Sequence, residues 1–215
     1  MGMKEIIKTL TSSRLMTVMA LSLVICQLSF SHAGAQSARS ILDKTAAVLS
    51  NKDGVTANFT MTNSQKLQVS GTVAVKGIKL YAKTQVGIIW FDGKTQWTYL
   101  TKNDEVSVTT PTAAQLQTIN PYTFINMYRD GYKYTLNKSG SEYKVHLTAT
   151  DPKRKIQEMF INVDKKTYAP TQVKLLQGNK WTLFDISGVK QQKLNDGMFR
   201  FSSKDFPNAE VIDLR

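Results

Sequence analysis

The sequence predicts a mostly β protein with a few helices, in which one antiparallel sheet curls into an open wall or barrel. Three observations predict this class. Apolar and polar residues alternate with a period of two over much of the chain after residue 55. Turn-forming residues interrupt these segments at short intervals, as in consecutive β-hairpins. The helical patterns are too few to flank both faces of a sheet, so we expect helices to cover one face or plug one opening.

The first 35 residues are expected to be a secretory signal peptide. Three basic residues precede an apolar stretch over residues 15–30, and Ala33-Gly34-Ala35 follows as a small-x-small cleavage pattern. The stretch is marginally short for a membrane span, although an uncleaved N-terminal anchor is the alternative. Residues 36–215 have the length of a single domain, which we expect to be exported.

Cysteine content and charge narrow the functional classes. The only cysteine, Cys26, lies in the apolar stretch, so we expect neither a disulfide nor thiol chemistry after cleavage. The formal net charge of +12 favours anionic lipid or acidic proteins as partners, although scattered lysines also fit a plain solvated surface. Nucleic acid is not an expected partner, because the aromatics Trp90 and Trp97 lie on apolar strands without interleaved arginines.

The predicted elements follow one another along the chain. Apolar residues on one side of the segment 38–49 predict an amphipathic helix. Six strands follow, at residues 55–62, 67–75, 78–83, 86–91, 95–100 and 106–108. Pro111 interrupts the sheet, and residues 112–128 are expected to form two short helices. About five more strands follow, which gives about 11 in all, at residues 132–136, 143–148, 156–163, 171–176 and 181–189, before a last short strand at 198–201.

Signals of enzymatic chemistry are weak. His146 is the only histidine after residue 35, and alternation places it opposite Val145 and Leu147, facing solvent. The sequence has no histidine pair or cysteine cluster for a metal, no Gly-x-Ser-x-Gly elbow and no glycine-rich phosphate loop. We therefore expect no enzyme and no cofactor. A hydrolase with two opposed carboxylates is the alternative.

The apolar side of the predicted sheet is the candidate binding site. A hollow interior could shelter lipid tails without a catalytic residue, because each buried CH₂ contributes about 0.8 kcal/mol. An ordinary packed core, as in a structural or adaptor domain, would give the same alternation. The residues expected to line a cavity are Phe59, Met61, Val73, Val75, Leu80, Ile88, Trp90, Trp97, Phe124 and Met127.

Four segments carry a distinctive pattern: residues 91–99 (FDGKTQWTY), 71–76 (GTVAVK), 120–124 (NPYTF) and the closing segment 199–213. In this order they resemble the LolA family of periplasmic lipoprotein carriers. The resemblance implies a periplasmic protein with an unclosed β-barrel and a helical lid over a hydrophobic cavity. It also implies acylated lipoproteins as cargo, an inner-membrane release complex as donor and an outer-membrane receptor as acceptor. We expect a monomer.

One position departs from the family pattern. Members of the family often have an arginine after the lysine of the second strand, where it takes part in closing the lid. Here that position is Gly77, between Lys76 and Ile78. Lys79 or Lys83 could substitute. The departure also fits a binding module of the same fold that takes another lipid or a glycolipid.

Overall fold

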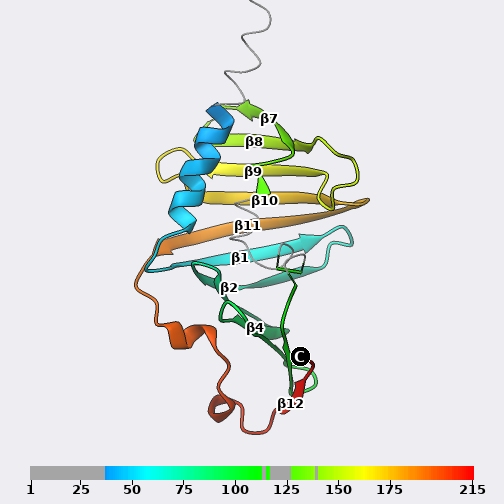
Figure 1. Ribbon diagram of the computed structural model, residues 1–215. Helices are drawn as coiled ribbons and strands as arrows, with labels where there is room; N and C mark the ends of the chain where they lie inside the picture. Colours follow the sequence, from blue (N-terminus) through cyan, green and yellow to red (C-terminus); the bar gives the residue numbers. More distant parts are fainter. Residues whose placement is uncertain (1–36, 113–114, 117–126, 139) are drawn as a thin grey trace, which may run out of the picture.

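The computed structural model describes residues 37–112, 115–116, 127–138 and 140–215, which form one helix and a 12-stranded sheet (Figure 1). The helix spans residues 37–49, as the sequence predicts. Within the described residues, no helix has the length and apolar character needed to span a membrane. The strands are β1 Val55–Asn63, β2 Gln68–Lys76, β3 Lys79–Thr84, β4 Gly87–Phe91, β5 Gln96–Leu100, β6 Glu105–Thr109, β7 Tyr132–Asn137, β8 Glu142–Ala149, β9 Glu158–Asp164, β10 Pro170–Gln177, β11 Lys180–Gln191 and β12 Glu210–Asp213.

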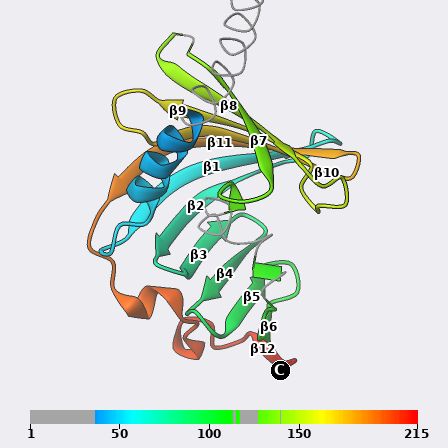
Figure 2. The same ribbon diagram turned by 45° about the horizontal axis from the view of Figure 1, so that its top comes forward.

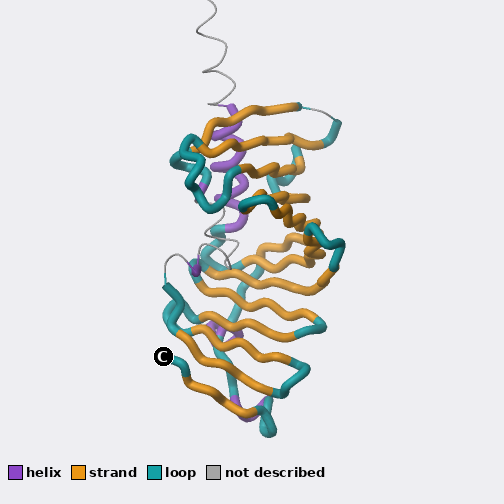
Figure 3. Tube along the Cα trace, turned by 90° about the vertical axis from the view of Figure 1, so that its right-hand side faces the viewer, coloured by secondary structure: helices purple, strands orange, loops and turns teal. Residues whose placement is uncertain are grey.

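The sheet consists of two antiparallel meanders joined side by side. Its order is β12-β6-β5-β4-β3-β2-β1-β11-β10-β9-β8-β7, and the joint is the pairing of β1 with β11. Figure 3 shows the strands as one continuous, twisting stack. The edge strands are β12 on one side and β7 on the other, so the sheet does not close into a barrel. The predicted unclosed antiparallel sheet is therefore confirmed.

The helix and four strands form the main core. Ala38, Leu42 and Ala46 recur every four residues, so they share one side of the helix, and all three are buried. They pack against buried side chains of β8, β9 and β10, among them Leu147 and Met159. Figure 2 shows the helix lying across this half of the sheet. We call the sheet face that carries the helix the inner face and the opposite one the outer face.

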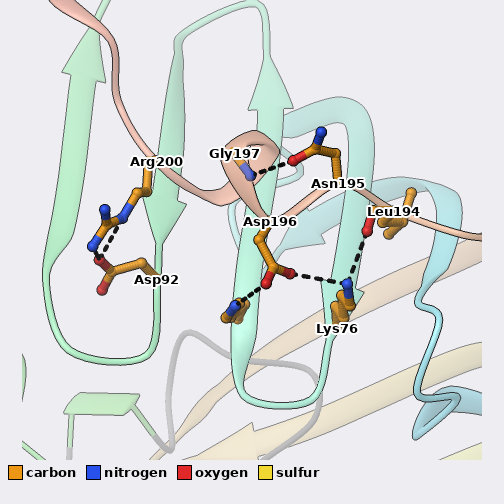
Figure 4. A network of polar contacts seen from close by, with 8 residues as sticks. Lys76, Asp92, Leu194, Asn195, Asp196, Gly197 and Arg200 are labelled. Atoms are coloured by element: carbon orange, nitrogen blue, oxygen red, sulfur yellow. Dashed lines mark hydrogen bonds and ion pairs between the residues drawn. The ribbon is translucent and has the colours of Figure 1, made fainter.

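The chain after β11 crosses the outer face of the other half of the sheet. We call residues 192–209 the strap. Leu194 and Phe199 pack on Ala74 of β2, and Phe199 is fully buried. Ion pairs hold the strap in place: Asp196 contacts Lys76 and Lys79 at 2.9 and 3.0 Å (Figure 4). The strap then leads to β12, the one strand that pairs in parallel, beside β6.

Two predicted segments need comment. The expected strand at 198–201 is wrong, because the 3₁₀ helix η1 spans Asp196–Phe199 and is followed by η2 at Ser203–Asp205. The Asn195 side chain accepts a hydrogen bond from the Gly197 N–H, and such local bonds compete with strand pairing. The two short helices expected within 112–128 lie mostly outside the described residues, which are helical at 115–116 and 127.

Candidate functional site

The inner face is apolar across the junction of the two meanders. Residues directly opposite each other in neighbouring antiparallel strands point to the same face. Val173 lies opposite Phe184, Phe184 opposite Met61, and Met61 opposite Val69. Farther along the same face, the side chains of β2, β3 and β4 continue this apolar surface. Apolar residues therefore connect β10 to β4 without interruption by charge.

Burial along this face is uneven. Beneath the helix, side chains such as Leu147 and Met159 are at most 1% exposed. At the far side, Val75, Leu80 and Phe91 are also buried, with Leu116 against them. Between these two parts lies a stretch of half-buried apolar side chains that we call the inner patch. It consists of Phe59, Met61, Val69, Val73, Ile89, Val173, Phe184 and Ile186.

Five of the ten predicted site residues share the inner face. Phe59, Met61 and Val73 belong to the inner patch. Val75 and Leu80 lie beside it and are buried. The remaining two inner candidates come from the segment between the meanders: Met127 packs against the core beneath the helix, whereas Phe124 lies outside the described residues. A ligand-binding role for these residues stays a prediction.

Ile88, Trp90 and Trp97 do not face the same interior, so their placement with the other candidates is wrong. Trp90 lies opposite both Tyr81 and Trp97, on the outer face. There it meets the strap, with ring centroids 5.6 Å from Phe201 and 5.5 Å from Phe206. Ile88 lies two residues before Trp90 in β4, so its side chain also points to the outer face. Trp90 therefore holds the strap to the sheet, and none of the three side chains faces the inner patch.

The predicted site residues include three of the eight residues of the inner patch and miss the other five. Phe184 and Ile186 flank Asp185 with the two-residue period of a one-faced strand, which was the available signal. The pairing of β1 with β11 could not be inferred from alternation within one strand, because more than 120 residues separate Phe59 from Ile186. Ile89 was missed because β4 is apolar in both phases.

The charged groups near β2 and β3 lie on the outer face. Lys76 and Lys79 lie opposite each other and both contact Asp196, and their hydrogen bonds lower the pKa of that carboxyl. Lys83 is exposed on the same face. Gly77 is exposed with φ +57°. Neither lysine considered as a substitute for the lid arginine therefore points toward the inner patch.

A second contact ties the strap to the β4–β5 turn. Arg200 donates to Asp92 from Nε and lies within 3.0 Å of it through Nη2 (Figure 4). Burial raises the pKa of Asp92, but hydrogen bonds from the Thr95 and Lys94 amides and from Arg200 outweigh it and lower the pKa. The carboxylate therefore stays charged and holds the strap over the outer face.

Tyrosine hydroxyls tie the helix to the start of the second meander and tie β7 to the segment before β9. Tyr128 donates to Asp43 of the helix, and Tyr132 donates to the carbonyl of Ile156 at 2.9 Å. Burial raises the pKa of both phenols, so they remain neutral hydrogen-bond donors. The helix is thereby anchored to the segment that precedes β7.

The titratable side chains outside the strap are dispersed in the part of the chain that the structure describes. Its residues include no group of three or more His, Cys, Asp or Glu side chains that could hold a metal ion. His146 lies on the outer face, as predicted, bound to Glu158 at 2.9 Å and stacked on Phe160. A cleft of about 480 Å³ opens along β11, β1 and β2, and its lining includes Phe59 and Ile186 of the inner patch beside polar residues such as Asn58, Thr60 and Asp185.

Comparison with solved structures supports the fold. The crystal structure of an uncharacterized conserved protein from Thermus thermophilus has a TM-score of 0.57 at 13% identity, covering 82% of this chain and 99% of that chain. A LolA superfamily protein from Nitrosomonas europaea gives a TM-score of 0.42 at 14% identity, covering 76% of this chain and 97% of that one. A putative outer membrane lipoprotein-sorting protein domain from Vibrio parahaemolyticus gives 0.44 at 12% identity, covering 77% and 97%.

Sequence comparison identifies the family. A search of curated proteins finds no significant match. The family model described as outer membrane lipoprotein carrier protein LolA matches residues 28–179, which is more than half of the chain. The proteins of this family are binding and carrier proteins. The chain therefore belongs to the LolA family of outer membrane lipoprotein carrier proteins.

Proposed function

We propose that the protein is a periplasmic carrier that shelters the acyl chains of lipoproteins on its inner patch during transfer from the inner to the outer membrane. The observation that carries the proposal is the inner patch itself. Its side chains are apolar and half-buried, and they lie between two parts of the inner face whose apolar side chains are buried. Exposed apolar surface of this kind marks an interaction site.

The dimensions of the inner patch suit an acyl chain. From β10 to β4 it crosses five inter-strand spacings, or about 24 Å at ~4.8 Å each. Burying ten methylenes there would contribute roughly 8 kcal/mol before ordering costs. Met61 is a flexible side chain that can follow a mobile ligand. Binding of this kind needs no cofactor and no catalytic group.

The proposed route follows from the family. An inner-membrane release complex would hand over the acylated lipoprotein, and an outer-membrane receptor would accept it. Residues 1–35 would serve as the signal peptide that brings the chain to the periplasm. We propose that the carrier works as a monomer and that it is not an enzyme.

Mass spectrometry and a pair of variants in β1 test the proposal. The protein isolated from the periplasm should retain an acylated ligand or take up a diacylated lipopeptide. Phe59→Asp places a carboxylate on the inner patch and should weaken lipopeptide binding at least 100-fold, because burying an unpaired charge costs several kcal/mol. Asn58→Asp adds the same charge one residue away, at an exposed outer-face position, and should bind normally.

Two results would count against this function. One is a wild-type protein that retains no acylated ligand and gains none when lipopeptide is offered. The other is equal binding by Phe59→Asp and Asn58→Asp, with both variants folded by circular dichroism. Either result would mean that the inner patch does not bind acyl chains.

A second candidate is a carrier of another lipid or of a glycolipid on the same face. The specific observation in its favour is Gly77 at the arginine position, together with the engagement of Lys76 and Lys79 by the strap. Lid closure through a cation at this place would then work differently or be absent. The identity of the retained ligand in the same mass spectrum separates the two candidates.

A further inference from the structure

Three neighbouring hairpin turns each present a large exposed apolar side chain at the same end of the sheet. Leu67 in the β1–β2 turn is 61% exposed, Val86 in the β3–β4 turn 57%, and Leu100 at the β5–β6 turn 43%. Because antiparallel strands reverse direction, every second turn of a meander lies at the same end. β1 to β6 are consecutive in the sheet, so these three turns form a row. We call this edge the turn end.

A fourth turn extends the row across the junction of the meanders. The β10–β11 turn leads into Trp181, whose backbone N–H donates to Ser64 Oγ at 2.7 Å. Ser64 Oγ in turn donates to the Trp181 carbonyl at 2.9 Å, so the tips of two hairpins are tied together. Neighbouring tips are two strands apart, or roughly 10 Å, and four tips span about 30 Å. Figure 2 shows the β1–β2 and β10–β11 turns at the same end of the strands.

Lysines accompany these apolar tips. Lys66, Lys102 and Lys180 lie in or next to the same turns and are exposed to solvent. Within the described part of the chain none of the three makes an ion pair. Asp104, which accepts a hydrogen bond from the Tyr99 hydroxyl, and Glu105 are the carboxylates in or next to the four turns, which leaves one net positive charge. The turn end therefore combines separate apolar tips with a net positive charge.

The opposite end of the sheet is different. Its turns also carry lysines, including Lys94, Lys138 and Lys166. The exposed large apolar side chain in its turns is Ile78, whose Cδ1 lies close over Gly93 of the next hairpin. Charge alone therefore does not distinguish the two ends, whereas a row of outward apolar tips does.

We propose that the turn end docks onto an anionic phospholipid surface. Side chains about 10 Å apart, with cations between them, do not make the contiguous apolar patch typical of a protein interface. A bilayer suits them, because lipid headgroups fill the space between shallowly inserted side chains. Each lysine near an anionic surface contributes about 1 kcal/mol. The proposal does not depend on the inner patch binding an acyl chain.

Vesicle flotation with matched variants tests the docking. The probes are vesicles of phosphatidylglycerol and phosphatidylethanolamine, with phosphatidylcholine vesicles as the neutral comparison. The triple variant Lys66→Gln/Lys102→Gln/Lys180→Gln should lower partitioning onto the anionic vesicles about 100-fold. The control Lys94→Gln/Lys138→Gln/Lys166→Gln removes the same charge from the opposite end and should change it less than about threefold, because salt screens charges beyond ~8 Å.

A second pair of variants tests the apolar tips. Leu67→Ser/Val86→Ser/Leu100→Ser should lower partitioning at least about tenfold, since each tip loses apolar area that the bilayer would cover. Ile78→Ser/Leu214→Ser changes exposed apolar residues away from the turn end and should partition as the wild-type protein does. Thermal unfolding of each variant confirms that it is folded, which is expected because all these positions are exposed.

The outcomes separate this inference from the proposed function. Docking is overturned if the wild-type protein binds neutral and anionic vesicles equally, or if both lysine triples lose partitioning to the same degree. It is also overturned if sedimentation shows that the tips join two copies of the chain and no vesicle is bound. Phe59→Asp should still bind anionic vesicles, and the turn-end variants should still bind lipopeptide in the absence of vesicles.

Discussion

Trp90 and Phe59 should respond to truncation in opposite ways, because they lie on opposite faces of the sheet. Trp90 is 6% exposed and packs edge-on against Phe201 and Phe206 of the strap. Replacing a buried Trp by Ala costs about 3–5 kcal/mol. The two edge-on ring contacts contribute roughly 0.5–1.5 kcal/mol each within that total. Phe59 is only half-buried, so Phe59→Ala should cost about 1–2 kcal/mol.

Urea unfolding and lipopeptide titration measure the two effects separately. With a slope of about 2 kcal/mol per molar urea, Trp90→Ala should lower the unfolding midpoint by roughly 2 M, and Phe59→Ala by less than about 1 M. Lipopeptide affinity should fall in Phe59→Ala and stay unchanged in Trp90→Ala. The assignment of faces is refuted if Trp90→Ala keeps its midpoint and loses lipopeptide binding, or if Phe59→Ala is the less impaired in binding.

Three other parts of the molecule give predictions of their own. The pKa of Asp196 is lowered from 3.8, so its ion pairs stabilise the strap above that pH and are lost as the pH falls through the lowered value. The near-UV circular dichroism of the strap should fall in that range, and Asp196→Asn should show the weaker signal at pH 7. A Cβ at Gly71 would lie 2.1 Å from the Lys83 carbonyl oxygen. Gly71→Ala should therefore cost about 1–3 kcal/mol in urea unfolding, whereas Gln68→Ala should stay within about 0.5. Leu42 is 2% exposed, and Leu42→Ala should cost about 2–5 kcal/mol and speed hydrogen exchange in the helix.

The order and type of most elements before residue 192 could be predicted because their signals are local. In β1, Phe59 and Met61 alternate with Asn58 and Thr60, so both the strand and its apolar side are readable from nine residues. The helix over 37–49 repeats its apolar residues every three or four positions, which is equally local. Turn residues such as Asp92 and Gly93 then fix where each hairpin reverses.

The residues of the inner patch could not be predicted with the same success, because the patch depends on strand partners distant in sequence. In β4, Ile88, Ile89, Trp90 and Phe91 are all apolar, and alternation cannot assign either phase of such a run to the inner face. The phase is settled by the strap, which covers Trp90 from more than 100 residues away. The pairing of β1 with β11, which adds Ile186 to the inner patch, also cannot be inferred from the local sequence.

The position of the inner patch follows from the positions of the helix and the strap in the sequence. The helix precedes β1 and fully buries inner-face side chains as far as Leu175 of β10. The strap follows β11 and packs its apolar residues on the outer face, against Ala74 and Trp90. Of the described segments, neither covers the inner face where β11 meets β1, although Phe59 and Phe184 continue the apolar surface there. A lipid tail at that junction would bury apolar surface that the described part of the chain leaves half-exposed, so a ligand bound there should stabilise the folded protein in proportion to its affinity.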